Sequence, residues 1–132
     1  MRFDLDAVFG VHEQGIRIRS KRAEILAGNL ANADTPNYQA RDIDFKQALQ
    51  DAQAGSEPRH MKITSKKHIQ TDGSGMSTEF VYRNPLQPSV DGNTVDTQME
   101  KAQFIENAMQ YQASLSFLTG KIKSLMSAIR GE

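Results

Sequence analysis

The C-terminal third of the chain carries the pattern that most limits its possible folds. Apolar residues recur there at alternating steps of four and three, which is the spacing of a heptad seam on one helix. The members of this apolar seam are Phe104, Ala108, Tyr111, Leu115, Leu118, Ile122, Leu125 and Ile129. A helix over residues 95–130 would be roughly 54 Å long at about 1.5 Å per residue. We expect a helix of this length to pack along a second helix, along neighbouring chains, or along both.

The start of this helix has its own local signal. Thr97 and Glu100 have the spacing of a capping box, and the turn residues Asp91, Gly92 and Asn93 come just before them. We therefore expect the Thr97 and Glu100 side chains to bond to the backbone of the first helical turn.

Residues 5–33 predict a second long helix near the N-terminus. Its apolar residues form two seams, one through Ile16, Ala23 and Leu30 and the other through Ile18 and Ile25. Two seams on one helix indicate contact with more than one partner. Three glycines lie within it, and they indicate either close helix approach or a weak helix. These glycines are Gly10, Gly15 and Gly28.

The run that follows residue 29 ends this helix. Pro36 has no backbone N–H, and its ring disfavours the α conformation at Thr35. Asn32 and Asn37 are of a residue type that tolerates the left-handed conformation of helix exits and tight turns. Residues 40–45 then alternate, with Arg41, Ile43 and Phe45 on one side and Ala40, Asp42 and Asp44 on the other. That period of two predicts an extended segment with one dry face.

The remaining middle region predicts little apolar burial. We expect a short helix at 46–54 and short strands at 61–64 and 79–83. The predicted fold class is mainly α, with the two terminal helices paired as an antiparallel coiled-coil-like unit. The core is expected to be discontinuous, formed by residues 1–33 and 94–132. Residues 34–93 are expected to be an extended, weakly β middle region.

Composition excludes several classes of function. The chain of 132 residues has 16 basic and 16 acidic residues, so it has no net charge with which to attract nucleic acid or an anionic membrane. It has no cysteine for a disulfide, a zinc–thiolate site or a thiol nucleophile. Asp4 and Asp6 stand where a secretory signal peptide would be basic and then apolar, so we expect no cleaved signal. The mean hydropathy of −0.57 indicates that apolar burial is completed against neighbouring copies.

No catalytic, cofactor-binding or metal-binding residues are predicted. The three histidines, His12, His60 and His68, do not make up a known metal-ligand motif, and we expect them to be ordinary surface residues. Asp42 and Asp44 would be the acids of a small hydrolase, which is the enzyme alternative. We expect instead that these two acids face solvent or pair with basic groups.

A cluster of basic residues in the N-terminal helix has three interpretations. Its members are Arg17, Arg19, Lys21 and Arg22. A nucleic-acid site would need interleaved aromatic residues, which the cluster lacks. A solvated helix face is the plainest interpretation. We favour a third, in which the cluster pairs with Asp42 or Asp44 across a subunit interface.

The turn resembles the signature a-x-N-x-A-N-x-x-T-P-G-Y of bacterial flagellar axial proteins, which form the rod, hook and filament junction. The matching residues are Asn29, Asn32, Thr35, Pro36 and Tyr38. Asn37 stands where that family usually has glycine, and asparagine is the next-best residue for positive φ. Residues 40–45, 82–96 and 106–112 are similar to segments of the family's proximal rod members.

The resemblance implies a non-enzymatic structural subunit without cofactors. It implies polymerisation through the terminal helices, transmission of torque, formation of an export channel, export by the flagellar type III apparatus and a place in the periplasmic rod. The implied partners are further copies of the chain, other flagellar rod proteins and the rod-base adaptor protein FliE. Two alternatives stay open: another axial subunit, or a cytoplasmic coiled-coil adaptor or secretion chaperone.

Overall fold

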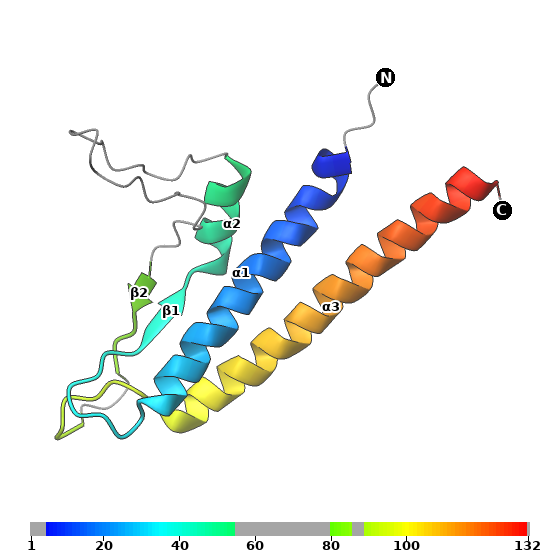
Figure 1. The fold of residues 1–132 in the computed structure, drawn as a ribbon. Coiled ribbons are helices and arrows are strands. Elements are labelled where there is room, and N and C mark those ends of the chain that lie inside the picture. Colours follow the sequence, from blue (N-terminus) through cyan, green and yellow to red (C-terminus); the bar gives the residue numbers. More distant parts are fainter. Residues whose placement is uncertain (1–4, 55–79, 86–88, 132) are drawn as a thin grey trace, which may run out of the picture.

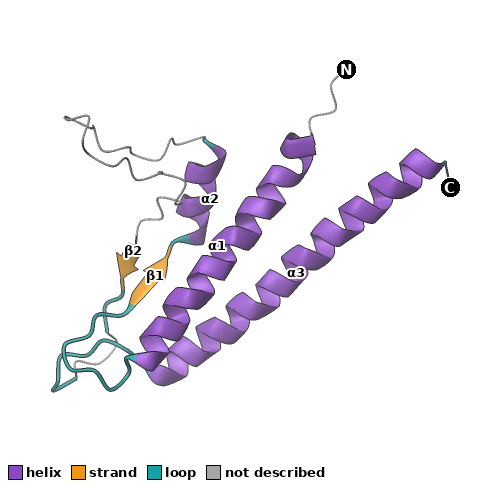
Figure 2. Ribbon diagram, in the orientation of Figure 1, coloured by secondary structure: helices purple, strands orange, loops and turns teal. Residues whose placement is uncertain are grey.

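The computed structural model of the chain describes residues 5–54, 80–85 and 89–131. The two long helices α1 (Leu5–Ala31) and α3 (Thr97–Arg130) run antiparallel and pack together, as Figure 1 shows. Between them in the chain come β1 (Arg41–Ile43), α2 (Phe45–Gln53) and β2 (Phe80–Tyr82). Figure 2 shows how small the strand pair is beside the helices. The mainly α class, the paired terminal helices and the weakly β middle are thus confirmed.

Helix α1 lies at the centre of the arrangement. Helix α2 and strand β1 contact it on one side and α3 contacts it on the other (Figure 1). The two long helices meet where α1 ends and α3 begins, and they diverge toward the chain termini. We call the meeting point the helix junction, formed by residues 22–31 of α1, the segment 37–43, Arg83, and residues 91–103.

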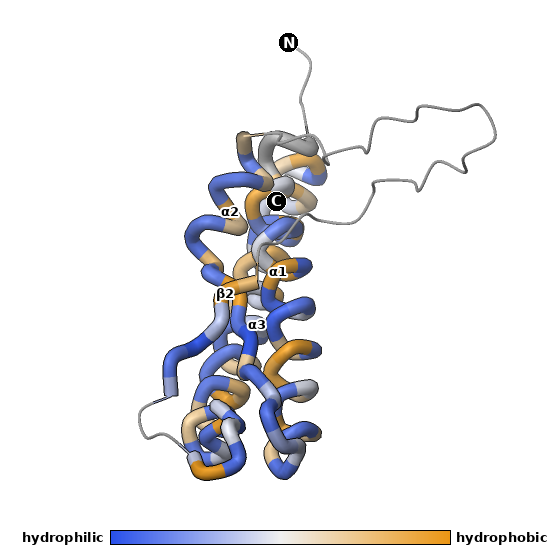
Figure 3. Tube along the Cα trace, turned by 90° about the vertical axis from the view of Figure 1, so that its left-hand side faces the viewer, coloured by the Kyte–Doolittle hydropathy of each residue, from blue (hydrophilic) through white to orange (hydrophobic). Residues whose placement is uncertain are grey.

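The apolar core is small. Ile18, Leu26, Ala40 and Ile43 are between 0% and 3% exposed, and they come from α1 and from β1 with the residue before it. Figure 3 shows apolar positions recurring between polar ones along the length of both long helices. Much of the apolar pattern of the sequence is therefore left outside this core.

The strand pair is antiparallel, with Arg41 opposite Tyr82 and Ile43 opposite Phe80. The expectation of one dry face over residues 40–45 was wrong. Ala40, expected on the polar side, is 1% exposed, because its N–H donates to Thr94 Oγ1 at 2.7 Å and its carbonyl accepts from Arg83 N at 3.1 Å. Arg41, expected on the dry side, is exposed. The segment is enclosed by two loops, so neither face is dry throughout.

The local signals at the middle elements had mixed outcomes. The helix expected at 46–54 is α2, and its N-cap is Asp44, whose carboxylate accepts from the N–H groups of Lys46 and Gln47. The strand expected at 79–83 is β2, whereas the strand expected at 61–64 lies outside the described residues. A Cβ at Gly15 would lie 3.8 Å from the Phe45 ring, which fits a close approach of α1 and α2 there.

The capping box expected at the start of α3 was wrong. The N-cap is Asp96, whose carboxylate accepts from Gln98 N at 2.9 Å and from Met99 N at 3.2 Å. Glu100 is 2% exposed and turns into the helix junction instead. The acid three residues after Thr97 is therefore part of the interior and not of the cap.

Candidate functional site: the helix junction and the apolar seam

The face that α3 turns toward α1 is polar over its first half. Gln103 accepts a hydrogen bond from Arg22 Nη2 at 2.8 Å, and Asn107 Nδ2 donates to the carbonyl of Arg19 at 2.9 Å. Gln110 also bonds to the Arg19 side chain. We call these residues of α3 the polar row: Glu100, Gln103, Asn107, Gln110 and Ser114. Their steps of three and four repeat every seven residues, as in a heptad seam.

The polar row runs beside the apolar seam. Gln103, Asn107, Gln110 and Ser114 each come one residue before a seam member, so the two rows are rotated by about 100° around the helix. Since the polar row faces α1, the neighbouring seam is only partly covered within the chain. Phe104, Ile122 and Ile129 are 37%, 42% and 85% exposed. Ala108 is exposed as well, and Tyr111, Leu115, Leu118 and Leu125 are half-buried.

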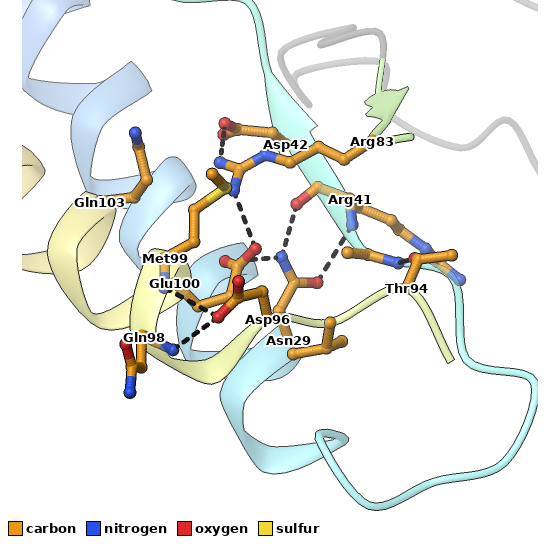
Figure 4. A network of polar contacts seen from close by, with 12 residues as sticks. Asn29, Arg41, Asp42, Arg83, Thr94, Asp96, Gln98, Met99, Glu100 and Gln103 are labelled. Carbon is orange, nitrogen blue, oxygen red and sulfur yellow. Dashed lines mark hydrogen bonds and ion pairs between the residues drawn. The ribbon is translucent and has the colours of Figure 1, made fainter. Parts of the chain in front are cut away.

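Four charged side chains alternate in sign at the helix junction. The guanidinium of Arg22 binds both carboxylate oxygens of Asp42, at 2.8 and 2.9 Å. Arg83 binds Asp42 with one nitrogen and Glu100 Oε1 with the other, the latter at 2.8 Å (Figure 4). We call these four residues the charge cluster. Its side chains are between 2% and 20% exposed, and its charges balance.

The pKa values of Asp42 and Arg22 are shifted by their pairing. Burial opposes ionisation of Asp42, but hydrogen bonds from Arg22, Arg83 and the Ile43 N–H together hold its pKa below the ordinary value. The hydrogen bond to Asp42 raises the pKa of Arg22, against the opposing effect of burial. Both groups are therefore ionised at neutral pH, and the cluster holds paired charges.

Asn29 joins three elements through its amide. It is 0% exposed, and its Nδ2 donates to the Arg41 carbonyl at 2.7 Å and to Glu100 Oε2 at 3.1 Å (Figure 4). Its Oδ1 accepts from Arg41 N at 3.1 Å and from the Tyr38 hydroxyl at 3.3 Å. A side chain with both a donor and an acceptor is needed here, because Arg41 offers a carbonyl and an N–H, Glu100 accepts and the Tyr38 hydroxyl donates.

The turn after α1 is held by the loop before α3. Asn93, 6% exposed, directs its Nδ2 at three backbone carbonyls beyond the helix end, namely Asn32 O at 3.0 Å, Ala33 O at 2.6 Å and Thr35 O at 3.0 Å. These carbonyls lie beyond the last residue of α1 and outside its ladder of backbone hydrogen bonds, and Asn32 O also accepts from Thr35 N at 3.1 Å. Helix α1 thus ends at Ala31, and Asn93, which is distant in sequence, donates hydrogen bonds to the carbonyls that follow it.

Asn37 adopts the left-handed conformation expected for this position, with φ of 60°. Its N–H donates to the Asp91 carbonyl at 2.9 Å, and its side chain lies against Gly92. Asn32 has an ordinary negative φ, so that part of the expectation was wrong. Its Nδ2 instead donates back to the Gly28 carbonyl at 2.8 Å. Pro36 is exposed in the same turn.

The structure separates the acids of the enzyme alternative. Asp42 is held by two arginines, whereas Asp44 caps α2. His12 is half-buried on α1, and His60 and His68 lie outside the described residues. Within residues 5–54, 80–85 and 89–131 there is no group of three or more histidine and acidic residues that could hold a metal ion. No helix in this part of the chain is long and apolar enough to cross a membrane.

The basic cluster of α1 pairs within the chain. Arg17 and Lys21 bind the neighbouring acids Glu13 and Glu24 on the exposed helix surface, at 2.7 and 2.8 Å. The expected pairing with Asp42 across a subunit interface was wrong, because the Arg22–Asp42 pair closes within one chain. The Arg19 guanidinium lies 4.1 Å from the centre of the Phe45 ring, a cation–π contact.

Comparison with known proteins bears on this arrangement. Residues 11–39, which include most of α1 and the turn, match the model of the family described as flagella basal body rod protein. The flagellar basal body rod protein FlgB of Aeromonas hydrophila is 47% identical, over 100% of this chain and 99% of that protein. FlgB of Escherichia coli K12 is 44% identical, over 96% and 95% of the two chains. The chain belongs to the FlgB family of flagellar basal body rod proteins.

Membership of the FlgB family makes the chain a structural subunit of the flagellar basal-body rod. It associates with other flagellar rod components and resides in the basal body. The FlgB relatives match over nearly the whole chain, so both the helix junction and the apolar seam lie within the compared length. The family match at 11–39 contains Asn29 and Asn37, two residues that position the turn.

Proposed function

We propose that this rod subunit polymerises through the apolar seam of α3, and that the terminal helices of successive subunits transmit torque and enclose the export channel. The exposure of the seam is the observation that carries this proposal. Four of its members, Phe104, Ala108, Ile122 and Ile129, are exposed in the single chain. Burial of apolar surface against a neighbour gains about 25 cal/mol per Å², so a seam along most of α3 is a strong driving force for assembly.

The position of the polar row supports the proposal that one side of α3 contacts α1 and another side contacts neighbouring subunits. Its residues bond to α1 over the first half of α3, so the exposed members of the seam are left for contacts outside the chain. Residues 1–33 and 94–132 would then be the assembly core, and residues 34–93 a middle region that positions it. The family-motif residues would act through the helix junction. They are Asn29, Asn32, Thr35, Pro36, Asn37 and Tyr38.

The partners on this proposal are further copies of the chain, other flagellar rod proteins and the rod-base adaptor FliE. The subunit leaves the cytoplasm through the flagellar type III apparatus without a cleaved signal peptide, and it assembles in the periplasmic part of the rod. Fractionation of the tagged protein tests this route. Periplasmic or basal-body protein that disappears when type III export is inactivated supports it, whereas cytoplasmic protein in both strains favours an adaptor or chaperone.

A charge placed in the seam tests the assembly surface. Leu118→Asp or Ile122→Asp should abolish swimming, because burying an unpaired carboxylate costs several kcal/mol. Ser124→Asp is the matched control, since Ser124 is exposed and lies about 200° around the helix from Ile122. All variants are compared at equal protein level in a strain lacking its own subunit. Normal swimming by the seam variants would mean that the seam is not an interface.

A further inference from the structure

The side chains of helix α3 that are buried most deeply against the rest of the chain are polar. The residues of α3 that are buried are Glu100 and Asn107, both polar. The nearly fully buried apolar side chains of the described residues lie instead on α1 and on residues 40–43. The core therefore joins α1 to the β1 segment, and α3 lies outside it.

The charges that α1 and α3 bring to the helix junction are compensated from the middle region. Arg22 of α1 and Glu100 of α3 are not a pair; they are linked through Asp42 of β1 and Arg83, which follows β2. Asp42 and Arg83 are 41 residues apart in sequence, and the pairing of β1 with β2 brings them together. The order in space is Arg22, Asp42, Arg83, Glu100, with each charge beside one of opposite sign (Figure 4 labels the last three).

We propose that the Asp42–Arg83 pair is an electrostatic clasp through which the β1–β2 pair holds α3 on α1. Breaking the clasp releases α3 from α1 while α1 stays packed on the β1 segment. This inference concerns the single chain and does not depend on which surface the rod uses for assembly.

The consequences of removing one member follow from burial. The Glu100 side chain is 2% exposed. Without Arg83, its carboxylate keeps the hydrogen bond from the Asn29 amide but loses its counter-charge. A buried carboxylate without a counter-charge is strongly unfavourable. The Glu100 carboxylate therefore moves into water, where it is hydrated again. Since Glu100 is on α3, this movement takes α3 off α1. The hydrogen bonds of the polar row oppose this movement only in part, because water replaces their partners once α3 has moved.

Distances between spin labels test the clasp in the full chain, which has no native cysteine. One pair, Ala27→Cys with Ala102→Cys, reports the α1–α3 distance; a second, Ala27→Cys with Lys46→Cys, reports α1 against α2. All three sites are exposed. With Arg83→Met, the α1–α3 distribution should broaden and lengthen while the second stays unchanged. Adding Glu100→Gln should restore the narrow α1–α3 distance, because no unpaired carboxylate then remains.

Arg41→Met is the matched control. It removes one cation from the same strand pair, but Arg41 lies exposed, 6.0 Å from the centre of the Tyr82 ring and outside the charge cluster. Its α1–α3 distance should stay narrow. An unchanged distance in Arg83→Met overturns the clasp, as does a broadened distance that Glu100→Gln does not restore. Broadening of both label pairs also overturns it, because Arg83 would then stabilise the whole fold.

Discussion

Asn93 holds the turn that follows α1, and its removal should lower the stability of the fold. Its Nδ2 supplies two hydrogens to the three carbonyls of residues 32, 33 and 35, and its Oδ1 accepts from Val95 N at 2.8 Å. Asn93→Ala removes about three hydrogen bonds at a site that is 6% exposed. At about 1 kcal/mol each, the free energy of unfolding should fall by about 3 kcal/mol.

Thermal unfolding followed by circular dichroism measures this loss. For a chain of this length, about 3 kcal/mol corresponds to a Tm lower by roughly 10 °C. Protein concentration is held constant, because self-association would raise the apparent stability. Asn93→Asp should be at least as harmful as Asn93→Ala, since a carboxylate would face the same carbonyls. Asn84→Ala, at an exposed site, is the control. If Asn93→Ala melts at the temperature of Asn84→Ala, the role given to these bonds is wrong.

Other consequences of the structure can be checked in the same chain. Gly92→Ala should lower the free energy of unfolding in urea by about 1–2 kcal/mol, because φ is +72° and the new Cβ would lie 2.6 Å from Asn37 Oδ1. Asn37→Gly should be tolerated alone and should restore part of that loss; no restoration would rule out the clash. The folded-state pKa of Asp42 is lowered, so its contribution to stability is present above the unfolded value of about 3.9 and is lost as pH falls below it. Asp42→Asn should reduce the fall in Tm between neutral and acidic pH. An unchanged fall would mean that other acidic residues cause it. In hydrogen exchange of dilute protein, amides of residues 116–130 should exchange faster than those of α1 near the helix junction, and equal protection would contradict this.

Local sequence patterns were sufficient to predict the main helices and the turn after α1. The heptad steps from Phe104 to Ile129 predicted α3, and Pro36 with its neighbours predicted that α1 ends before the turn. The positive φ of Asn37 also followed from residue type. Each of these depends on interactions within a few residues, which is why sequence alone was enough.

The helix junction could not be predicted in this way, because its contacts join distant residues. Asn93 lies 58–61 residues from the carbonyls that it binds, and nothing near it in sequence marks those partners. The polar row did leave a signal, since Gln103, Asn107 and Gln110 repeat at heptad steps. An apolar seam with the same steps runs beside it. Because long helices usually pack through apolar residues, the polar row was not recognised as the side that faces α1.

The central claim is that the apolar seam of α3 is an assembly surface. Electron cryomicroscopy of basal bodies containing this subunit tests it most directly. We predict that Phe104, Ile122 and Ile129 lie within van der Waals contact of neighbouring rod subunits, with the polar row still facing α1 of the same chain. A rod in which these three side chains face water, or in which the polar row makes the contacts between subunits, would contradict it.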